Sequence, residues 1–119
     1  MHELSVCMSL LDQVTAIAAE RDARRITRIE LTVGPLSGIE IDLLETAWPI
    51  AAAGTLADNA AFVVTATEIV VQCRACGANT TAQNNRLLCG SCGASQTHVI
   101  SGEEMILQRV ELETSTDSG

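Results

Sequence analysis

Apolar residues recur at helical spacing over the first twenty positions of the chain. They lie three or four residues apart with polar side chains between them: Leu4, Met8, Leu10, Leu11, Val14, Ile17 and Ala18. This spacing predicts an amphipathic helix of about four turns. We expect it to begin near Ser5, an acceptable N-cap, and to end at the charged segment 21–25, which we expect to form a solvated turn.

Alternation then replaces the helical spacing. Ile29, Leu31 and Val33 alternate with polar residues and predict a half-buried strand, which stops at the turn residues of segment 34–38. Helical spacing returns over 39–53. This second helix contains Pro49, which we expect to kink or shorten it because proline donates no backbone hydrogen bond.

The second half of the chain is strand-like on both sides of a polar, cysteine-containing insert. Residues 61–72 are β-branched and alternating, which predicts one long strand, and residues 105–112 predict a last strand. We therefore predict an α+β fold with a small mixed three-stranded sheet, two helices and an inserted zinc-ribbon-like lobe. The expected domains are an α/β domain over 1–72 completed by 103–113, a cysteine-containing lobe over 73–98, and a flexible tail over 114–119.

Composition narrows the function classes. The 119 residues include 47% hydrophobic residues but only two aromatic ones, Trp48 and Phe62, so the core must be aliphatic, and we expect Trp48 to lie inside it. There are 15 acidic and 7 basic residues and a net charge of -8. Because non-specific nucleic-acid binding needs clustered cations, this balance argues against a nucleic-acid partner.

No segment of the sequence suggests export or membrane insertion. The N-terminus has no basic residue before Arg21, whereas a secretory signal opens with a positive segment. The longest uncharged apolar run, 50–56, is far shorter than the roughly 18–20 residues that span a bilayer. We expect a cytoplasmic protein with no membrane partner.

Four of the five cysteines form two Cys-x-x-Cys pairs, each followed by glycine and separated by twelve residues. Four thiolates match a closed tetrahedral zinc site, and the polar insert around them has too few apolar residues for a core of its own. The predicted structural zinc ligands are Cys73, Cys76, Cys89 and Cys92. Two alternatives are a rubredoxin-type iron site, which has the same ligand set, and a dithiol redox pair, which belongs near a βαβ unit that is not evident here.

The N-terminus offers a second set of donors. The α-amine of Met1, the backbone nitrogen of His2 and its imidazole can close two fused chelate rings on one ion. The backbone nitrogen or the carboxylate of Glu3 can complete a plane that favours Ni(II) or Cu(II). On chemistry alone, the simpler interpretation is that His2 is an exposed residue at a chain end.

Several motifs, taken together, favour the nickel site over an exposed histidine at a chain end. The start Met1-His2-Glu3-Leu4-Ser5, the turn Gly34-Pro-Leu-Ser-Gly38, both cysteine pairs and the segment Ser101-Gly-Glu-Glu-Met105 resemble the HypA/HybF family of nickel metallochaperones for [NiFe]-hydrogenase maturation. The resemblance covers all but the last few residues. No single motif is specific, but the combination is.

The resemblance implies a function and a set of roles. Met1, through its amine, His2 and the adjacent Glu3 match the family's Ni(II) site, and the four paired cysteines match its structural Zn(II) site. The implied partners are a nickel-handling GTPase accessory protein and the hydrogenase large subunit, and some family members also serve urease. The protein would carry nickel and would not be an enzyme.

Other residues allow competing interpretations. Cys7 is either a core residue, which we favour, or a reactive thiol near a helix start, and His98 is most simply a surface residue rather than a zinc ligand. The arginines between 21 and 28 either end a helix, which we favour, or dock an acidic partner. The alternative function is a zinc-ribbon protein-interaction adaptor without nickel transfer.

Overall fold

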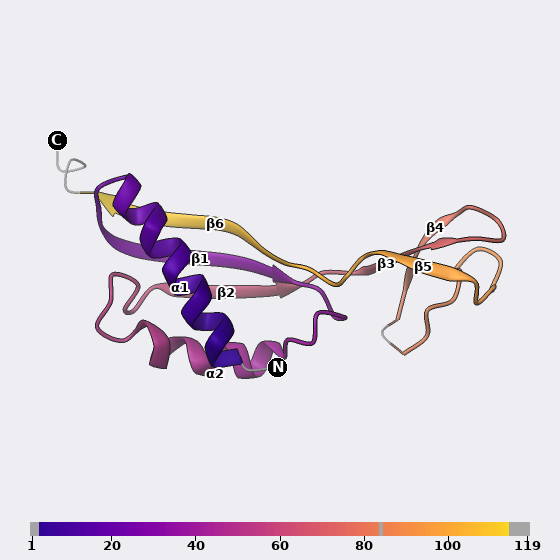
Figure 1. Cartoon of the computed structure of the whole chain (residues 1–119), viewed down its shortest axis with the longest axis horizontal. Coiled ribbons are helices and arrows are strands. Elements are labelled where there is room, and N and C mark those ends of the chain that lie inside the picture. Colours follow the sequence, from indigo (N-terminus) through magenta and orange to yellow (C-terminus); the bar gives the residue numbers. More distant parts are fainter. Residues whose placement is uncertain (1–2, 84, 115–119) are drawn as a thin grey trace. The chain divides into compact units, whose positions relative to one another are not determined.

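The computed structural model describes residues 3–83 and 85–114. Within them the chain forms two helices and two three-stranded sheets (Figure 1). The elements in chain order are α1 (Glu3–Glu20), β1 (Ala23–Val33), α2 (Ile41–Ala52), β2 (Ala61–Ala66), β3 (Ile69–Cys73), β4 (Asn79–Ala82), β5 (Thr97–Ser101) and β6 (Met105–Thr114). The predicted α+β class is confirmed, and a second sheet is formed by β4, inside the insert, with β3 and β5, which flank it.

The chain divides into two compact units. The first, which we call the body, comprises Met1–Leu31, Glu40–Thr65 and Leu107–Gly119. The second, which we call the cysteine unit, comprises Thr32–Ile39 and Ala66–Ile106. The predicted division into a nickel-binding and a zinc-binding part concerns metals and stays a prediction.

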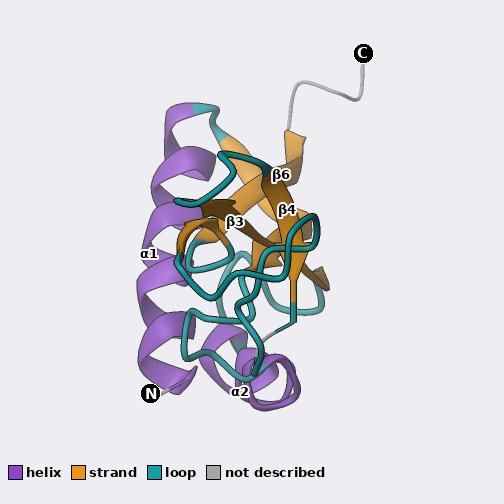
Figure 2. Ribbon diagram, turned by 90° about the vertical axis from the view of Figure 1, so that its right-hand side faces the viewer, coloured by secondary structure: helices purple, strands orange, loops and turns teal. Residues whose placement is uncertain are grey.

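The body is built on the sheet β2-β1-β6, with α1 lying across one face (Figures 1 and 2). The arrows of β1 and β2 run in the same direction and that of β6 runs opposite, so this sheet is mixed as predicted. The buried positions of α1 are three or four residues apart, and those of β1 lie mostly at alternate positions. They are Cys7, Leu10, Leu11, Val14 and Ala18 on α1, and Ile26, Ile29, Leu31 and Val33 on β1.

Helix α2 packs against α1 and carries the aromatic part of the core. Trp48 is buried, as predicted, and its ring stacks on Phe62 with the centroids 4.5 Å apart. Pro49 lies inside the helix, which nevertheless continues to Ala52. The two aromatic residues of the chain therefore join α2 to the outer strand β2.

Two predicted boundaries are wrong. Helix α1 begins at Glu3, before the predicted cap Ser5, because the buried Glu3 carboxylate anchors the first turn on the backbone of Glu40. Residues Ala23–Arg25, predicted as part of a turn, open strand β1, and the Arg24 side chain pairs with Glu113 of β6. The charged side chains of this segment suggested a loop, but its backbone belongs to β1, the central strand of the sheet β2-β1-β6.

The strand predicted over 61–72 is in fact two strands in different sheets. β2 belongs to the body, whereas β3 is the central strand of the sheet β4-β3-β5 in the cysteine unit. Between them the Thr67 N–H donates to the Val33 carbonyl at 3.0 Å and Glu68 is exposed. Alternating β-branched residues indicated extended backbone, but they do not show that the chain changes its pairing partners.

The described part of the chain contains no helix that is both long enough and apolar enough to cross a bilayer.

Candidate metal centre

The four paired cysteines come together at one end of the sheet β4-β3-β5. Cys73 is the last residue of β3, Cys76 lies in the turn to β4, and Cys89 and Cys92 lie between β4 and β5. All four Sγ atoms lie within 4.8 Å of one another, with Cys73–Cys92 at 3.6 Å and Cys76–Cys89 at 3.7 Å. Four sulfurs placed tetrahedrally at 2.3 Å around a zinc ion are about 3.8 Å apart, so the arrangement fits a zinc ion coordinated by four thiolates.

Each cysteine pair forms a knuckle in which backbone N–H groups point at the first sulfur. Ala75 and Cys76 donate to Cys73 Sγ at 3.3 and 3.4 Å. The second knuckle repeats these bonds, with Ser91 and Cys92 donating to Cys89 Sγ at 3.3 and 3.4 Å. Donors aimed at a sulfur stabilise its thiolate, which is the form that binds a metal.

A glycine closes each knuckle. The Gly77 N–H donates to the Cys73 carbonyl and the Gly93 N–H to the Cys89 carbonyl, both at 2.9 Å. Their φ angles are +80° and +78°, a left-handed conformation in which a Cβ atom is disfavoured. This explains why both cysteine pairs are followed by glycine.

The two knuckles also hold each other, through residues that the sequence analysis missed. The Arg74 N–H donates to the Gln96 carbonyl at 2.7 Å, and the Gly90 N–H donates to the Thr80 hydroxyl at 2.8 Å. Thr80 and Gln96 each follow the second cysteine of a knuckle by four residues. That equal spacing was the available signal, although nothing in the residue types pointed to it.

The four thiols differ in burial and in pKa. Cys73 and Cys89 are buried and Cys76 and Cys92 are exposed. Hydrogen bonds from the backbone of Cys92 and Ser91 lower the pKa of Cys89 to about 6, and the backbone of Cys76 lowers the pKa of Cys73. The Ala94 N–H alone would lower the pKa of Cys92, but hydrogen bonding with the other thiols and burial outweigh it and raise that pKa to about 11.

The central turn and the last loop meet beside this sheet. The Gly34 N–H donates to the Glu104 carbonyl at 2.7 Å, and the Leu36 N–H donates to the Gly102 carbonyl at 2.8 Å. A Cβ atom on Gly34 would lie 2.1 Å from the Gly102 oxygen. The motifs 34–38 and 101–105, far apart in sequence, therefore form one close backbone contact.

At the other predicted site, Met1 and His2 lie outside the described residues. Glu3 is the first residue of α1, and its side chain is buried. Its Oε2 accepts a hydrogen bond from the Glu40 N–H at 3.2 Å, immediately before α2 begins. The carboxylate therefore connects the starts of the two helices.

Comparison with known proteins identifies the family. The family model described as "Hydrogenase/urease nickel incorporation, metallochaperone, hypA" matches residues 1–112. The chain belongs to the HypA family. Relatives named hydrogenase maturation factor HypA include one from Nitrosospira multiformis, 41% identical over 97% of this chain and 100% of the relative, and one from Aquifex aeolicus, 35% identical over 95% and 98%.

A solved structure shares the HypA fold. The solution structure of the Ni metallochaperone HypA from Helicobacter pylori aligns with a TM-score of 0.69 over 97% of this chain and 100% of that chain, at 22% identity. The family consists of metallochaperones for hydrogenase and urease nickel incorporation. The prediction that this chain is not an enzyme is therefore confirmed by its family.

Two remaining candidates take no part in the cysteine cluster of this HypA-family chain. Cys7 is fully buried, its thiol donates to the Leu44 carbonyl at 3.6 Å, and burial, with the charge of Glu3, raises its pKa. It is a core residue, as favoured. His98 is exposed on β5 opposite Gln72, outside the group of four sulfurs.

Proposed function

We propose that this protein carries Ni(II) at its N-terminus and delivers it for maturation of [NiFe]-hydrogenase. Family membership over residues 1–112 is the observation that carries the proposal. The Met1-His2-Glu3 start supplies the donors: the α-amine, the His2 backbone nitrogen and the His2 imidazole. A planar, nitrogen-rich set favours Ni(II).

The contact between Glu3 and Glu40 supports one choice for the fourth ligand. The Glu3 carboxylate is buried and already accepts the Glu40 N–H, so it is engaged within the fold. We infer that the backbone nitrogen of Glu3 completes the plane and that its carboxylate holds the start of α1 against α2.

We propose that the four cysteines hold a structural Zn(II). The separations of 3.6 and 3.7 Å between facing sulfurs support a tetrahedral four-thiolate ion. Such a site has no open position for a substrate, and zinc would contribute folding energy to a lobe with few apolar residues. The zinc-binding lobe is then 73–98, inserted into a nickel-binding part formed by 1–72 and 103–113.

Delivery follows from the position of the nickel donors. A ligand set at a chain terminus can give up its donors one at a time to an incoming ligand, so the ion can pass through a shared-ligand intermediate. We propose a nickel-handling GTPase accessory protein and the hydrogenase large subunit as partners, and the cytoplasm as the location.

The chain suits a sharp test of the nickel site because it contains no lysine, which leaves the α-amine as its only primary amine. Acylation at the amine should abolish nickel binding by calorimetry, and so should His2→Ala. Elemental analysis should show one zinc per chain throughout. His98→Ala, which removes the only other histidine, is the matched control and should bind nickel like the parent.

One outcome would contradict the nickel site itself, and another would contradict the choice of fourth ligand. Undiminished nickel binding by the acylated protein or by His2→Ala would remove the N-terminal site and favour the adaptor function. Loss of nickel binding in Glu3→Gln, with α1 intact by circular dichroism, would assign the fourth ligand to the carboxylate. Because the imidazole must be neutral to bind, nickel affinity should also fall as the pH drops through about 6–7.

A further inference from the structure

A groove of about 260 Å³ runs along the body between the end of α1 and the strand β6. Helix α1 contributes Ile17 and Arg21, and β6 contributes the remaining lining residues. These are Leu107, Gln108, Arg109, Val110 and Leu112. The lining therefore combines four aliphatic side chains with two guanidinium groups.

The charge of this groove is opposite to that of the chain. The protein has 15 acidic and 7 basic residues, yet the lining contains two arginines and no carboxylate. Arg21 is exposed and forms no ion pair with any described residue. Arg109 is 64% exposed and pairs with Glu111, its neighbour on β6. Both guanidinium groups can therefore be reached by an incoming carboxylate.

Strand β6 also presents an open backbone edge. It lies at the end of the sheet order β2-β1-β6, so within the described chain only its β1 side is paired. It is ten residues long and contains no proline. Exposed strand edges are normally kept short or interrupted, because their free N–H and C=O groups accept a further strand.

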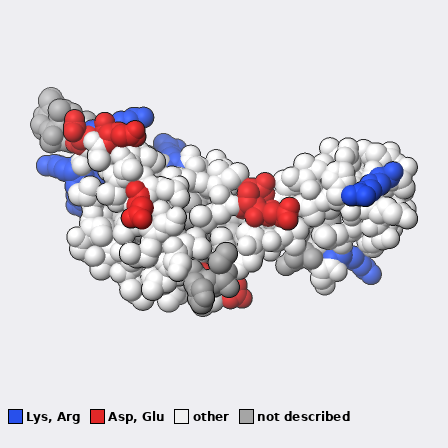
Figure 3. Space-filling view, viewed as in Figure 1, with Lys and Arg blue, Asp and Glu red and all other residues white. Residues whose placement is uncertain are grey.

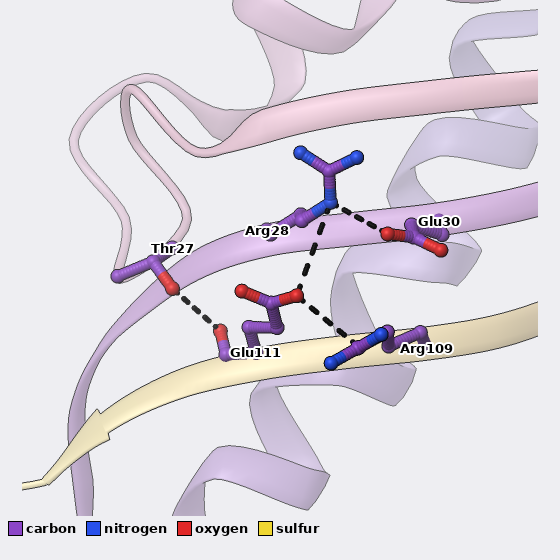
Figure 4. A network of polar contacts seen from close by, with 5 residues as sticks. All are labelled: Thr27, Arg28, Glu30, Arg109 and Glu111. Carbon is purple, nitrogen blue, oxygen red and sulfur yellow. Dashed lines mark hydrogen bonds and ion pairs between the residues drawn. The ribbon is translucent and has the colours of Figure 1, made fainter.

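The paired side of β6 is firmly held. The Glu111 Oε2 atom lies 3.9 Å from Arg28 Nε of β1 and 3.1 Å from Arg109 Nε (Figure 4). The Thr27 hydroxyl of β1 donates to the Glu111 backbone carbonyl at 3.1 Å. This network joins β6 to β1 and places Arg109 at the rim of the groove. A strand added at the open edge would meet a surface that is already formed.

We propose that the open edge of β6 docks an extended acidic segment of a partner protein. The segment would pair with the β6 backbone, place carboxylates on Arg21 and Arg109, and cover Ile17 and the aliphatic residues of β6. The charge of the lining selects an acidic segment, and the chain's own net charge of -8 disfavours a second copy. This surface is independent of the proposed nickel donors.

The test uses a fluorescein-labelled octapeptide of alternating glutamate and valine, with binding followed by fluorescence anisotropy. The parent should bind it, and Arg21→Gln with Arg109→Gln should weaken binding by at least about tenfold. Arg74→Gln with Arg86→Gln changes the net charge equally but lies in the cysteine unit, so it should bind like the parent. The same peptide N-methylated at alternate residues cannot form a strand ladder and should not bind.

Amide chemical shifts distinguish the remaining outcomes. On peptide binding the largest changes should fall on β6 and on the last turn of α1. Absence of binding, equal weakening by the two double variants, or shift changes confined to another surface would overturn the proposal. It would also be overturned if sedimentation showed dimers of this chain that the Arg21 and Arg109 substitutions dissociate, because a second copy would then be the occupant.

Discussion

Gly34 lies where two backbone segments of the cysteine unit come very close together. A methyl group there would lie 2.1 Å from the Gly102 oxygen, whereas a methyl group on Gly38 would meet nothing within 4 Å and only face a φ of +81°. We expect Gly34→Ala to lower the free energy of unfolding by about 3 kcal/mol or more, and Gly38→Ala by about 1–2 kcal/mol. Urea denaturation of both variants measures this difference, and equal losses would contradict the contact.

The lowered pKa of Cys89 predicts how the cysteine unit responds to acid. Its folded pKa of about 6 lies below the roughly 8.5 of an unfolded thiol, so the resulting stabilisation is complete above about 8.5 and is lost as the pH falls through 6. Bound zinc favours the thiolate further, so zinc release on acidification should have its midpoint below pH 6. A zinc indicator dye read during a pH titration checks this, and release above pH 7 would contradict it.

At the scale of single elements, α2 begins without a side-chain cap. Glu40 occupies the N-cap position, its side chain makes no capping bond, and its own N–H is taken by Glu3. Glu40→Ser should raise the free energy of unfolding by about 0.5–1 kcal/mol, because a serine hydroxyl can accept an N–H of the first turn. Glu40→Ala is the control, since it removes the carboxylate without adding a cap. Equal unfolding energies in thermal or urea melts would show that no cap forms.

The elements also show what sequence can and cannot provide. Helix α2 and the last strand were predicted to within two residues, because their apolar spacing is regular and each lies between turn residues. The division of 61–72 into β2 and β3 was missed, because strand pairing is a long-range property. Arg24 and Arg25 were missed for the same reason, since their strand conformation depends on neighbours 30 or more residues away.

The cysteine cluster could be predicted because its chemistry is local. Two thiols on one turn, followed by a glycine, specify a knuckle without reference to the rest of the fold. The residues that hold one knuckle to the other, Thr80 and Gln96, could not be predicted, because their role appears only once the two turns face each other. For the same reason nothing in the sequence indicated that Glu3 reaches the start of α2.

For the whole molecule, the division into two units predicts separable unfolding. The cysteine unit buries few large apolar side chains beyond Ile69 and Val71, whereas the body has its own aliphatic core. Removing zinc with a chelator under reducing conditions should therefore collapse the amide signals of 69–102 into the narrow range of an unfolded chain and leave the body folded. Trp48, the only tryptophan, lies in the body, so its fluorescence should hardly change. A large change in that emission would show that the body depends on zinc.

Charge is distributed unevenly over the same molecule. Segment 69–102 contains no aspartate or glutamate, and where β4 and β5 lie, on the right of Figure 3, the visible charged side chains are all blue. A bound zinc with four thiolates would itself carry a charge of about -2. That charge would offset Arg74 and Arg86 and leave segment 69–102 almost neutral, whereas the body is strongly acidic.

The two knuckles make the same N–H to Sγ hydrogen bonds, so the chain offers an ion two equivalent binding turns. Each knuckle is a bidentate chelator, and the twelve residues between Cys76 and Cys89 act as a tether that sets the effective concentration of one chelator around the other. Doubling the length of a flexible tether costs only about 0.6 kcal/mol. Strand β4 lies within this tether and Thr80 contacts the second knuckle, so the tolerant part is the loop after Ala82. Affinity for the ion should survive insertions there far better than changes in the turns themselves, which makes such insertions an accessible route by which the lobe can diversify.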